Sequence, residues 1–156
     1  MFIYFMDIRL IEMGLFKVKA TIWNPLNKER KISVNLTVDT GSTYTVLPAD
    51  ILQQLGIKPI RVTKLRLADN RVVEKPLGEI GIEIEGYTAS VTPVVFGEEG
   101  VYLLGSVTME QLGLAPDPLQ KKLKPVEALM MQLQSSYRFH QLPPATSPNT
   151  GSSSKK

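Results

Sequence analysis

The residues best suited to chemistry in this 156-residue chain are carboxylates. The sequence has no cysteine and a single histidine, His140, which excludes thiolate nucleophiles, cysteine–zinc sites and multi-histidine metal sites. The most informative segment is the Asp-Thr-Gly-Ser sequence at 39–42. A carboxylate held in such a segment can act as a general base or acid toward water. Because Asp and Gly also form ordinary turns, the segment alone leaves a purely structural turn as the alternative.

The residues before Asp39 predict a strand that delivers this carboxylate to a loop. Apolar and polar side chains alternate over residues 32–38, as in a strand with one buried face. After the loop, Pro48 is suited to the start of a helix and Gly56 to its end. A short helix is therefore expected directly behind the loop.

The body of the chain has the pattern of strands. Together with 32–38, the expected strands cover 16–22, 62–68, 71–77, 80–84 and 87–95, which gives five or six strands up to Val95. Asp69-Asn70 is expected to join two of them as a hairpin, and a second short helix is expected from Ser106, as its cap, to Gly113. The pattern favours an all-β fold with one or two short helices.

The segment 121–134 allows two interpretations. Apolar residues follow helical spacing from Val126 to Leu133, behind Pro125, and this pattern predicts a helix. The alternative is a final strand over residues 122–130.

Composition favours one folded domain. With 43% apolar residues the chain can bury a core, and its length suits a single domain. We expect an N-terminal extension at 1–12, the folded domain at 13–134, and a disordered tail at 135–156, where serine, proline and threonine dominate.

Charge and hydropathy bear on partners and location. Between Met13 and Leu133, 14 basic residues face 13 acidic ones, so the body is nearly neutral and nucleic acid is not expected as a partner. The apolar opening at 1–6 is far shorter than the roughly 20 residues that span a bilayer, and Asp7 interrupts it, unlike a secretory signal. No membrane association and a cytoplasmic location are therefore expected.

Several ordered features resemble one known family. The Asp-Thr-Gly loop follows a strand, Val-Leu-Pro follows it at 46–48, and Leu-Leu-Gly at 103–105 precedes a short helix. Together they resemble the retropepsin-like aspartic peptidases of clan AA, most closely a small prokaryotic single-domain subgroup. The resemblance runs from about Met13 to Val126 and implies an acid-protease barrel.

The resemblance implies roles for individual residues. Asp39 would be the catalytic carboxylate, Thr40 would hydrogen-bond across to a partner loop, and Gly41 would let the loop approach closely. Ser42 would hydrogen-bond an outer carboxylate oxygen. The expected substrate-binding residues are Ser42 and, in a hairpin flap over the cleft, Leu67, Ala68, Asp69, Asn70 and Arg71.

The flap assignment has an alternative, because any solvent-exposed hairpin favours residues such as Asp69 and Asn70. Asn70 also stands where the family usually has glycine. The tip is therefore interpreted as a flap on the strength of the resemblance.

The aspartate count bears on assembly. The chain has five aspartates, and only Asp39 is followed by Thr-Gly, so one chain supplies half of a paired site. The resemblance then implies a C2 homodimer that acts as an aspartic endopeptidase on peptide or protein substrates, with no metal or organic cofactor. One alternative is a non-catalytic dimeric peptide-binding or dimerisation module with the same fold. Another is a carboxylate metal-binding protein, which the lack of a second acidic residue beside Asp39 disfavours.

Overall fold

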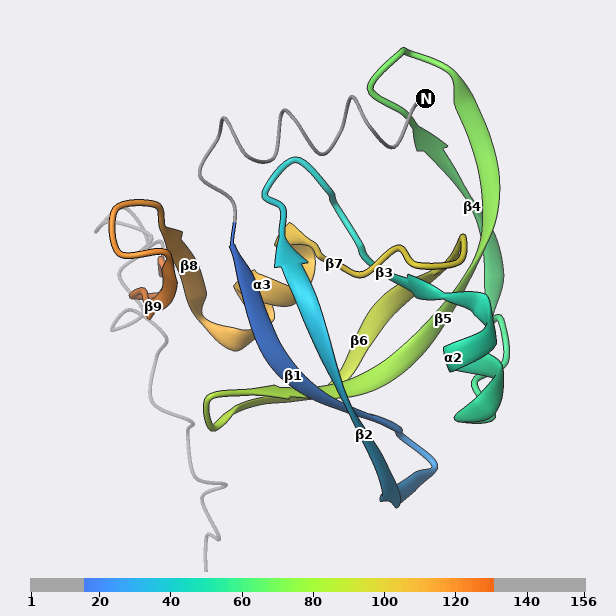
Figure 1. Ribbon diagram of the computed structural model, residues 1–156, viewed down its shortest axis with the longest axis horizontal. Helices are drawn as coiled ribbons and strands as arrows, with labels where there is room; N and C mark the ends of the chain where they lie inside the picture. Colours follow the sequence, from blue (N-terminus) through green and yellow to red (C-terminus); the bar gives the residue numbers. More distant parts are fainter. Residues whose placement is uncertain (1–15, 131–156) are drawn as a thin grey trace, which may run out of the picture.

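The computed structural model describes residues 16–130, which form a β-rich fold with two short helices (Figure 1). Within that part of the chain the strands are β1 (Lys17–Asn24), β2 (Asn27–Val38), β3 (Thr45–Pro48), β4 (Arg61–Arg66), β5 (Val72–Ile84), β6 (Tyr87–Gly97), β7 (Leu103–Leu104), β8 (Leu114–Asp117) and β9 (Lys122–Pro125). The helices are α2 (Ala49–Gln54) and α3 (Ser106–Leu112), and no helix among these residues is long and apolar enough to cross a membrane. The predicted all-β class is confirmed. The expected extension at 1–12 and tail at 135–156 lie outside the described residues.

Alternating side chains shape β2 as the sequence indicated. Val34, Leu36 and Val38 are buried, while Ser33 and Asn35 between them are exposed. β2 pairs antiparallel with β1, whose apolar side chains join the same core. The strand ends at Val38, so the residue that follows it emerges at the end of the barrel wall.

The strands close into a barrel with one additional hairpin arm. The sheet order is β1-β2-β7-β3-β6-β5-β4, and a further pairing between β1 and β5 joins the two sides. The closed part therefore contains six strands, and β4 stays outside it, paired with the first half of β5. Two expectations differ from the structure up to Val95. The strands expected at 71–77 and 80–84 form the single strand β5, which pairs with β6 from Leu77 to Ile84, and β3 is an additional strand that was not expected.

Trp23 explains how β1 and β5 approach each other closely. Trp23 is opposite Gly81 in the β1–β5 register and is only 4% exposed. A Cβ atom on residue 81 would lie 2.1 Å from the indole nitrogen of Trp23. Glycine is thus required where the indole packs on β5, and Lys31 covers another part of the ring with its Nζ 5.0 Å from the ring centroid. Trp23 serves strand packing.

β7 is the strand that brings distant residues to the end of β2. It lies between β2 and β3, parallel to β2 through Val38↔Leu104 and antiparallel to β3 through Val46↔Leu103. The Leu-Leu-Gly sequence is thereby placed beside the loop that contains Asp39.

Both predicted short helices are present, with one difference. α2 follows Pro48 and ends before Gly56, whose φ is +73°, and α3 ends at Gly113, whose φ is +67°. The prediction that Ser106 caps α3 is wrong. Gly105 occupies the capping position, because its carbonyl accepts the first intrahelical hydrogen bond from the N–H of Met109 (3.1 Å), and Ser106 is the first helical residue.

The helix predicted from Val126 is wrong over the residues that the structure describes. Residues 122–125 form β9, which pairs with β8, and residues 126–130 are not helical. Asp117 Oδ1 accepts hydrogen bonds from two backbone N–H groups in the intervening turn, which returns the chain antiparallel. Leu123 is then buried, and the N–H of Val126 donates to Gly113 (2.9 Å), so the alternative of a final strand is closer to the structure.

Candidate active site

Asp39 lies in the loop that joins β2 to β3. The backbone N–H of Gly41 donates to Asp39 Oδ1 (2.9 Å), and that of Ser42 donates to the Asp39 carbonyl (3.2 Å). The two bonds fold the loop into a tight turn that fixes one carboxylate oxygen. Asp39 is half-buried, whereas Thr40 and Gly41 are exposed. The turn therefore presents its Thr-Gly step to the surface.

Ser42 is held within the same loop. Its hydroxyl donates to the carbonyl of Tyr44 (2.7 Å). A serine hydroxyl has one proton, so this proton is not directed at the Asp39 carboxylate as the resemblance implied. In the single chain Ser42 stabilises the turn.

The segment that crosses behind the loop is bonded to both of its ends. At the start of the loop, the Asp39 N–H donates to Leu104 O (3.1 Å). Further along the loop, the carbonyls of residues 42 and 43 accept from the first two N–H groups of α3, at 2.8 Å and 3.0 Å. The first N–H groups of a helix have no partner within it, so the start of α3 satisfies these donors with loop carbonyls. Asp39 is thus held from both sides by residues 104–107.

Gly105 permits this close crossing. A Cβ atom on residue 105 would lie 2.3 Å from the carbonyl carbon of Tyr44 and 2.7 Å from the nitrogen of Thr45. Both are backbone atoms, which cannot swing aside as a side chain can. Only glycine allows the two segments to touch at this point.

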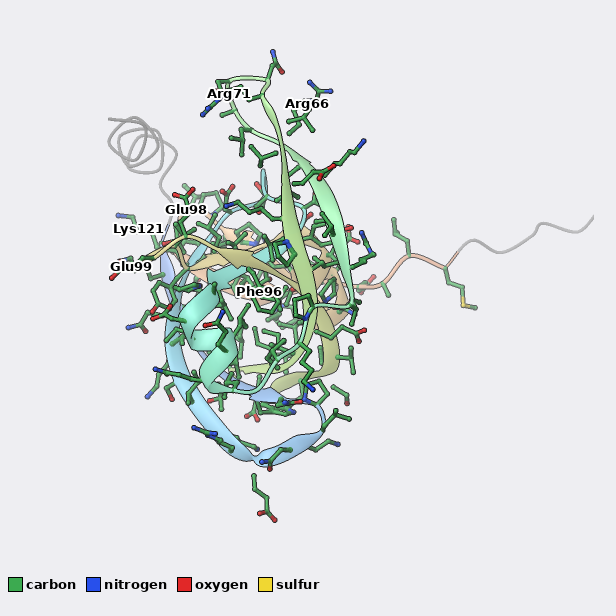
Figure 2. All side chains as sticks on the ribbon, turned by 90° about the vertical axis from the view of Figure 1, so that its right-hand side faces the viewer. Arg66, Arg71, Phe96, Glu98, Glu99 and Lys121 are labelled. Carbon is green, nitrogen blue, oxygen red and sulfur yellow. The ribbon has the colours of Figure 1, made fainter. Side chains whose placement is uncertain are left out.

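The predicted flap residues lie on the hairpin of β4 and β5. The two strands pair from Arg61↔Leu77 to Arg66↔Val72. Figure 2 shows the hairpin extending away from the rest of the described chain, with Arg66 and Arg71 near its outer end. Leu67 is half-buried, and the other four predicted tip residues, Ala68 to Arg71, are exposed. The hairpin itself is confirmed; its role over a substrate stays a prediction.

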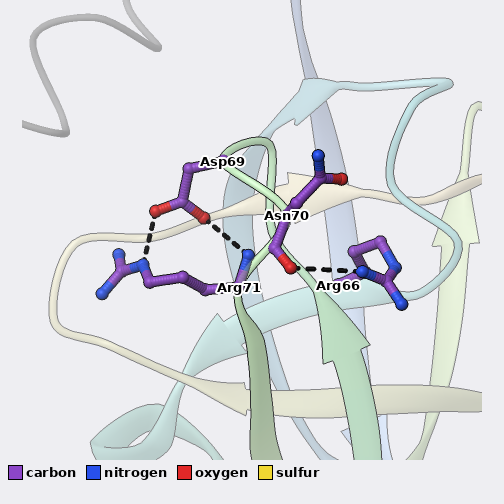
Figure 3. A network of polar contacts seen from close by, with 4 residues as sticks. All are labelled: Arg66, Asp69, Asn70 and Arg71. Carbon is purple, nitrogen blue, oxygen red and sulfur yellow. Dashed lines mark hydrogen bonds and ion pairs between the residues drawn. The ribbon is translucent and has the colours of Figure 1, made fainter.

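Polar contacts order the hairpin tip (Figure 3). Asp69 pairs with the guanidinium of Arg71, and Arg66 Nη1 donates to the carbonyl of Asn70 (3.2 Å). Partial desolvation raises the pKa of Asp69, but the hydrogen bonds and positive charge of Arg71 outweigh it, and the pKa lies below its usual value. The tip is therefore organised by its own side chains.

Asn70 supplies the backbone conformation for which glycine is the common choice. Its φ is +68°, in the left-handed region that asparagine tolerates better than most residues.

Asn70→Ala is expected to lower the free energy of unfolding by about 1 kcal/mol, whereas Asn70→Gly leaves it nearly unchanged. Chemical denaturation of the two variants measures the difference. Equal stability of both would contradict the conformational argument.

Sequence reasoning missed two groups of residues around the loop. Arg61 Nη2 lies 3.4 Å from the hydroxyl of Tyr44, which connects the base of the hairpin to the end of the loop. Thr45, Thr92 and Thr108 are fully buried, and the Thr108 hydroxyl is hydrogen-bonded to each of the other two. One indication of the threonine group was present in the sequence: Thr45 is a polar residue at a position of β3 that faces the apolar core.

The arrangement of potential metal ligands can be described for residues 16–130. Across residues 16–130, no group of three or more Asp, Glu or His side chains is placed to hold a metal ion. The site geometry therefore rests on one carboxylate, loop hydroxyls and backbone groups.

The comparison with known families agrees with this geometry. A sequence model described as "Aspartyl protease" matches residues 18–112, more than half of the chain, and this range contains the Asp39 loop, the hairpin, β7 and α3. None of the curated proteins compared with the chain is significantly similar to it. With a closed β-barrel, an Asp-Thr-Gly turn at the end of β2 and a Leu-Leu-Gly segment crossing behind it, the chain belongs to the retropepsin-like aspartyl protease family.

Proposed function

We propose that the protein is an aspartic endopeptidase that acts as a homodimer, with one Asp39 from each subunit. The observation that carries this proposal is the single Asp-Thr-Gly turn, which is bonded on both sides to residues 104–107 and leaves Thr40 and Gly41 exposed. A rigidly held carboxylate beside an exposed edge suits a site completed by a second copy. Family membership supports the chemistry.

The reaction needs two carboxylates with different protonation. One Asp39 would take a proton from water, while the other, protonated, would donate to the carbonyl oxygen of the peptide bond. The attacking water oxygen forms a bond to the carbonyl carbon, and the resulting tetrahedral intermediate expels the amine after it is protonated. Two carboxylates about 3 Å apart hold one shared proton, because both cannot be ionised at that distance.

The other predicted site residues would position these groups and the substrate. Thr40 would hydrogen-bond to the partner's loop, and Gly41 lets the two loops approach. Ser42 and the tip residues Leu67 to Arg71 would contact the peptide, with the hairpin closing over it. The proposed substrate is a peptide or protein in extended conformation, and the mechanism uses no metal or organic cofactor.

The proposed location is the cytoplasm. The chain has no cysteine for the disulfides that stabilise many small secreted domains. Neither nucleic acid nor membrane is proposed as a partner.

Subunit mixing tests both the activity and the shared site. Wild type and Asp39→Asn are mixed in equal amounts, subunit exchange is verified by mass spectrometry of a labelled chain, and hydrolysis of an unstructured protein is followed under acidic conditions. Random pairing leaves about a quarter of the dimers wild type in both halves. Activity should then fall to about half of that of wild type alone at the same wild-type concentration, because about half of the wild-type chains are paired with an inactive partner.

An exposed carboxylate provides the matched control. Asp50 lies in the first turn of α2, and an equal mixture of wild type with Asp50→Asn should keep the wild-type activity per chain, which is about twice the activity of wild type alone at the same wild-type concentration. Full activity after verified exchange with Asp39→Asn would mean that each chain works alone. No hydrolysis by the wild-type dimer would instead favour the non-catalytic peptide-binding or dimerisation module.

A further inference from the structure

Three buried threonine hydroxyls form a hydrogen-bonded chain behind the Asp39 loop. Thr45 Oγ1 lies 2.7 Å from Thr108 Oγ1, which lies 2.8 Å from Thr92 Oγ1. All three residues have 0% exposure, and they come from β3, α3 and β6. Hydroxyls at this depth are unfavourable unless they are hydrogen-bonded, and valine has nearly the same shape without that requirement. The three hydroxyls are therefore expected to have a role that valine could not fill.

Thr108 is the centre of this chain. It bonds to both other threonines, so losing its hydroxyl breaks both links, whereas losing the Thr92 hydroxyl breaks one. At the other end, Thr45 Oγ1 accepts a hydrogen bond from the Gly105 backbone N–H (3.1 Å). Since the Thr45 oxygen accepts this hydrogen bond through a lone pair, the hydroxyl proton of Thr45 is available to donate to Thr108 Oγ1. The chain thus connects α3 and β6 to the backbone of the crossing segment.

Gly105 is where the chain meets the candidate active site. Its neighbours Leu104 and Ser106 bond to Asp39 and Ser42, at the two ends of the catalytic turn. The position of the Asp39 carboxylate relative to the barrel therefore depends on how residues 104–107 pack against residues 42–45. The hydrogen bond from the Gly105 N–H to Thr45 Oγ1 links those two segments directly and uses a side-chain oxygen as the acceptor.

We propose that Thr108 is a positioning residue for Asp39, acting through Thr45 and Gly105. The catalytic part of this proposal rests on the proposed function. Without the Thr108 hydroxyl, Thr45 loses a partner and the Gly105 crossing gains freedom, so the two Asp39 carboxylates meet less often in the geometry that shares a proton. Small displacements of catalytic groups reduce turnover strongly. Substrate binding should change little, because Thr108 is fully buried beneath the loop.

The test compares Thr108→Val, which keeps the shape and removes the hydroxyl, with Thr108→Ser, which keeps the hydroxyl. We expect Thr108→Val to lower kcat about 10- to 100-fold with KM nearly unchanged, and Thr108→Ser to retain most of the wild-type kcat. Ile84→Val serves as the stability control, because Ile84 is buried at the β5–β6 turn, away from the β2–β3 loop (Figure 1). It should lower the melting temperature without lowering kcat of the folded enzyme.

Amide hydrogen exchange supplies a readout that does not depend on activity. In Thr108→Val, without substrate, the amides of Gly105, Ser106 and Gly41 should exchange faster than in wild type, while those of β1 and β2 stay protected. If Thr108→Val does not fold, Thr92→Val breaks the outer link alone and should shift kcat and exchange in the same direction by less.

The outcomes separate the two proposals. Unchanged kcat together with unchanged exchange at Gly105 and Ser106 would overturn the positioning role. Inactive wild-type protein would refute the proposed function, and faster exchange in Thr108→Val would then still support the role of the hydroxyl chain in holding the Asp39 loop. Equal losses of kcat in Thr108→Val and Thr108→Ser would overturn the role of the hydroxyl, because they would show that shape matters instead.

Discussion

Asp39→Asn is expected to abolish peptide hydrolysis while the chain keeps its fold. Asparagine has nearly the volume of aspartate, and its amide oxygen can still accept the hydrogen bond from the Gly41 N–H. The amide cannot take a proton from water or donate an acidic proton to the peptide carbonyl. General acid–base catalysis contributes about 10²- to 10⁴-fold in rate, so the loss should be at least of this order.

Steady-state hydrolysis and thermal unfolding of the same preparations check this expectation. Asp50→Asn is again the control, because it removes one exposed carboxylate from α2 and leaves the loop untouched. A melting temperature near that of wild type shows that the lost activity is chemical. Substantial hydrolysis by folded Asp39→Asn would remove Asp39 from the mechanism.

Gly105→Ala should have the largest structural effect of any single methyl group added near the site. The new Cβ would lie 2.3 Å and 2.5 Å from the carbonyl carbon and oxygen of Tyr44. Gly105 has φ −91° and ψ 168°, which alanine adopts readily, so the cost is steric alone. Relief requires the crossing segment and the loop to move apart, at about 3 kcal/mol, the upper end of the usual cost of overpacking. Activity should fall with it, because the same movement displaces Asp39.

Gly86→Ala provides the contrast. Gly86 has φ +85° in the β5–β6 turn, and no atom lies within 4 Å of the position that a Cβ would take, so alanine there meets strain without a clash. It should cost about 1 kcal/mol and leave activity per folded dimer unchanged. Denaturant titration of both variants measures the difference. Similar losses at the two positions would contradict the close crossing at Gly105.

The sequence allowed prediction of the elements that local patterns specify. Alternation located β2 and hence the position of Asp39 at its end. The break expected between the strands at 80–84 and 87–95 is a tight turn at Glu85-Gly86, where both residues have positive φ. The error after Pro125 has a tertiary cause. Helical spacing from Val126 was outweighed by pairing of residues 122–125 with β8, which buries Leu123.

Local sequence patterns could not predict the contacts that residues 104–108 make with the Asp39 loop and Thr45. Ser106 matched a helix cap by residue type, but the strand crossing moved that position to Gly105. The partners Thr45 and Thr108 are 63 residues apart, so no window of the sequence shows that their hydroxyls meet. The family resemblance supplied the expected catalytic roles, and the structure shows the contacts that hold the Asp39 loop.

The insertion of β7 between β2 and β3 has a consequence for biosynthesis. Gly105 and Thr45 are 60 residues apart, so a chain still on the ribosome has made Asp39 well before it makes the segment that frames it. Pairings of such long sequence separation form late in folding. A nascent chain that ends before Leu103 therefore carries the aspartate without its frame. Under the proposed function, a chain can complete a paired site only after β7 and α3 have been made.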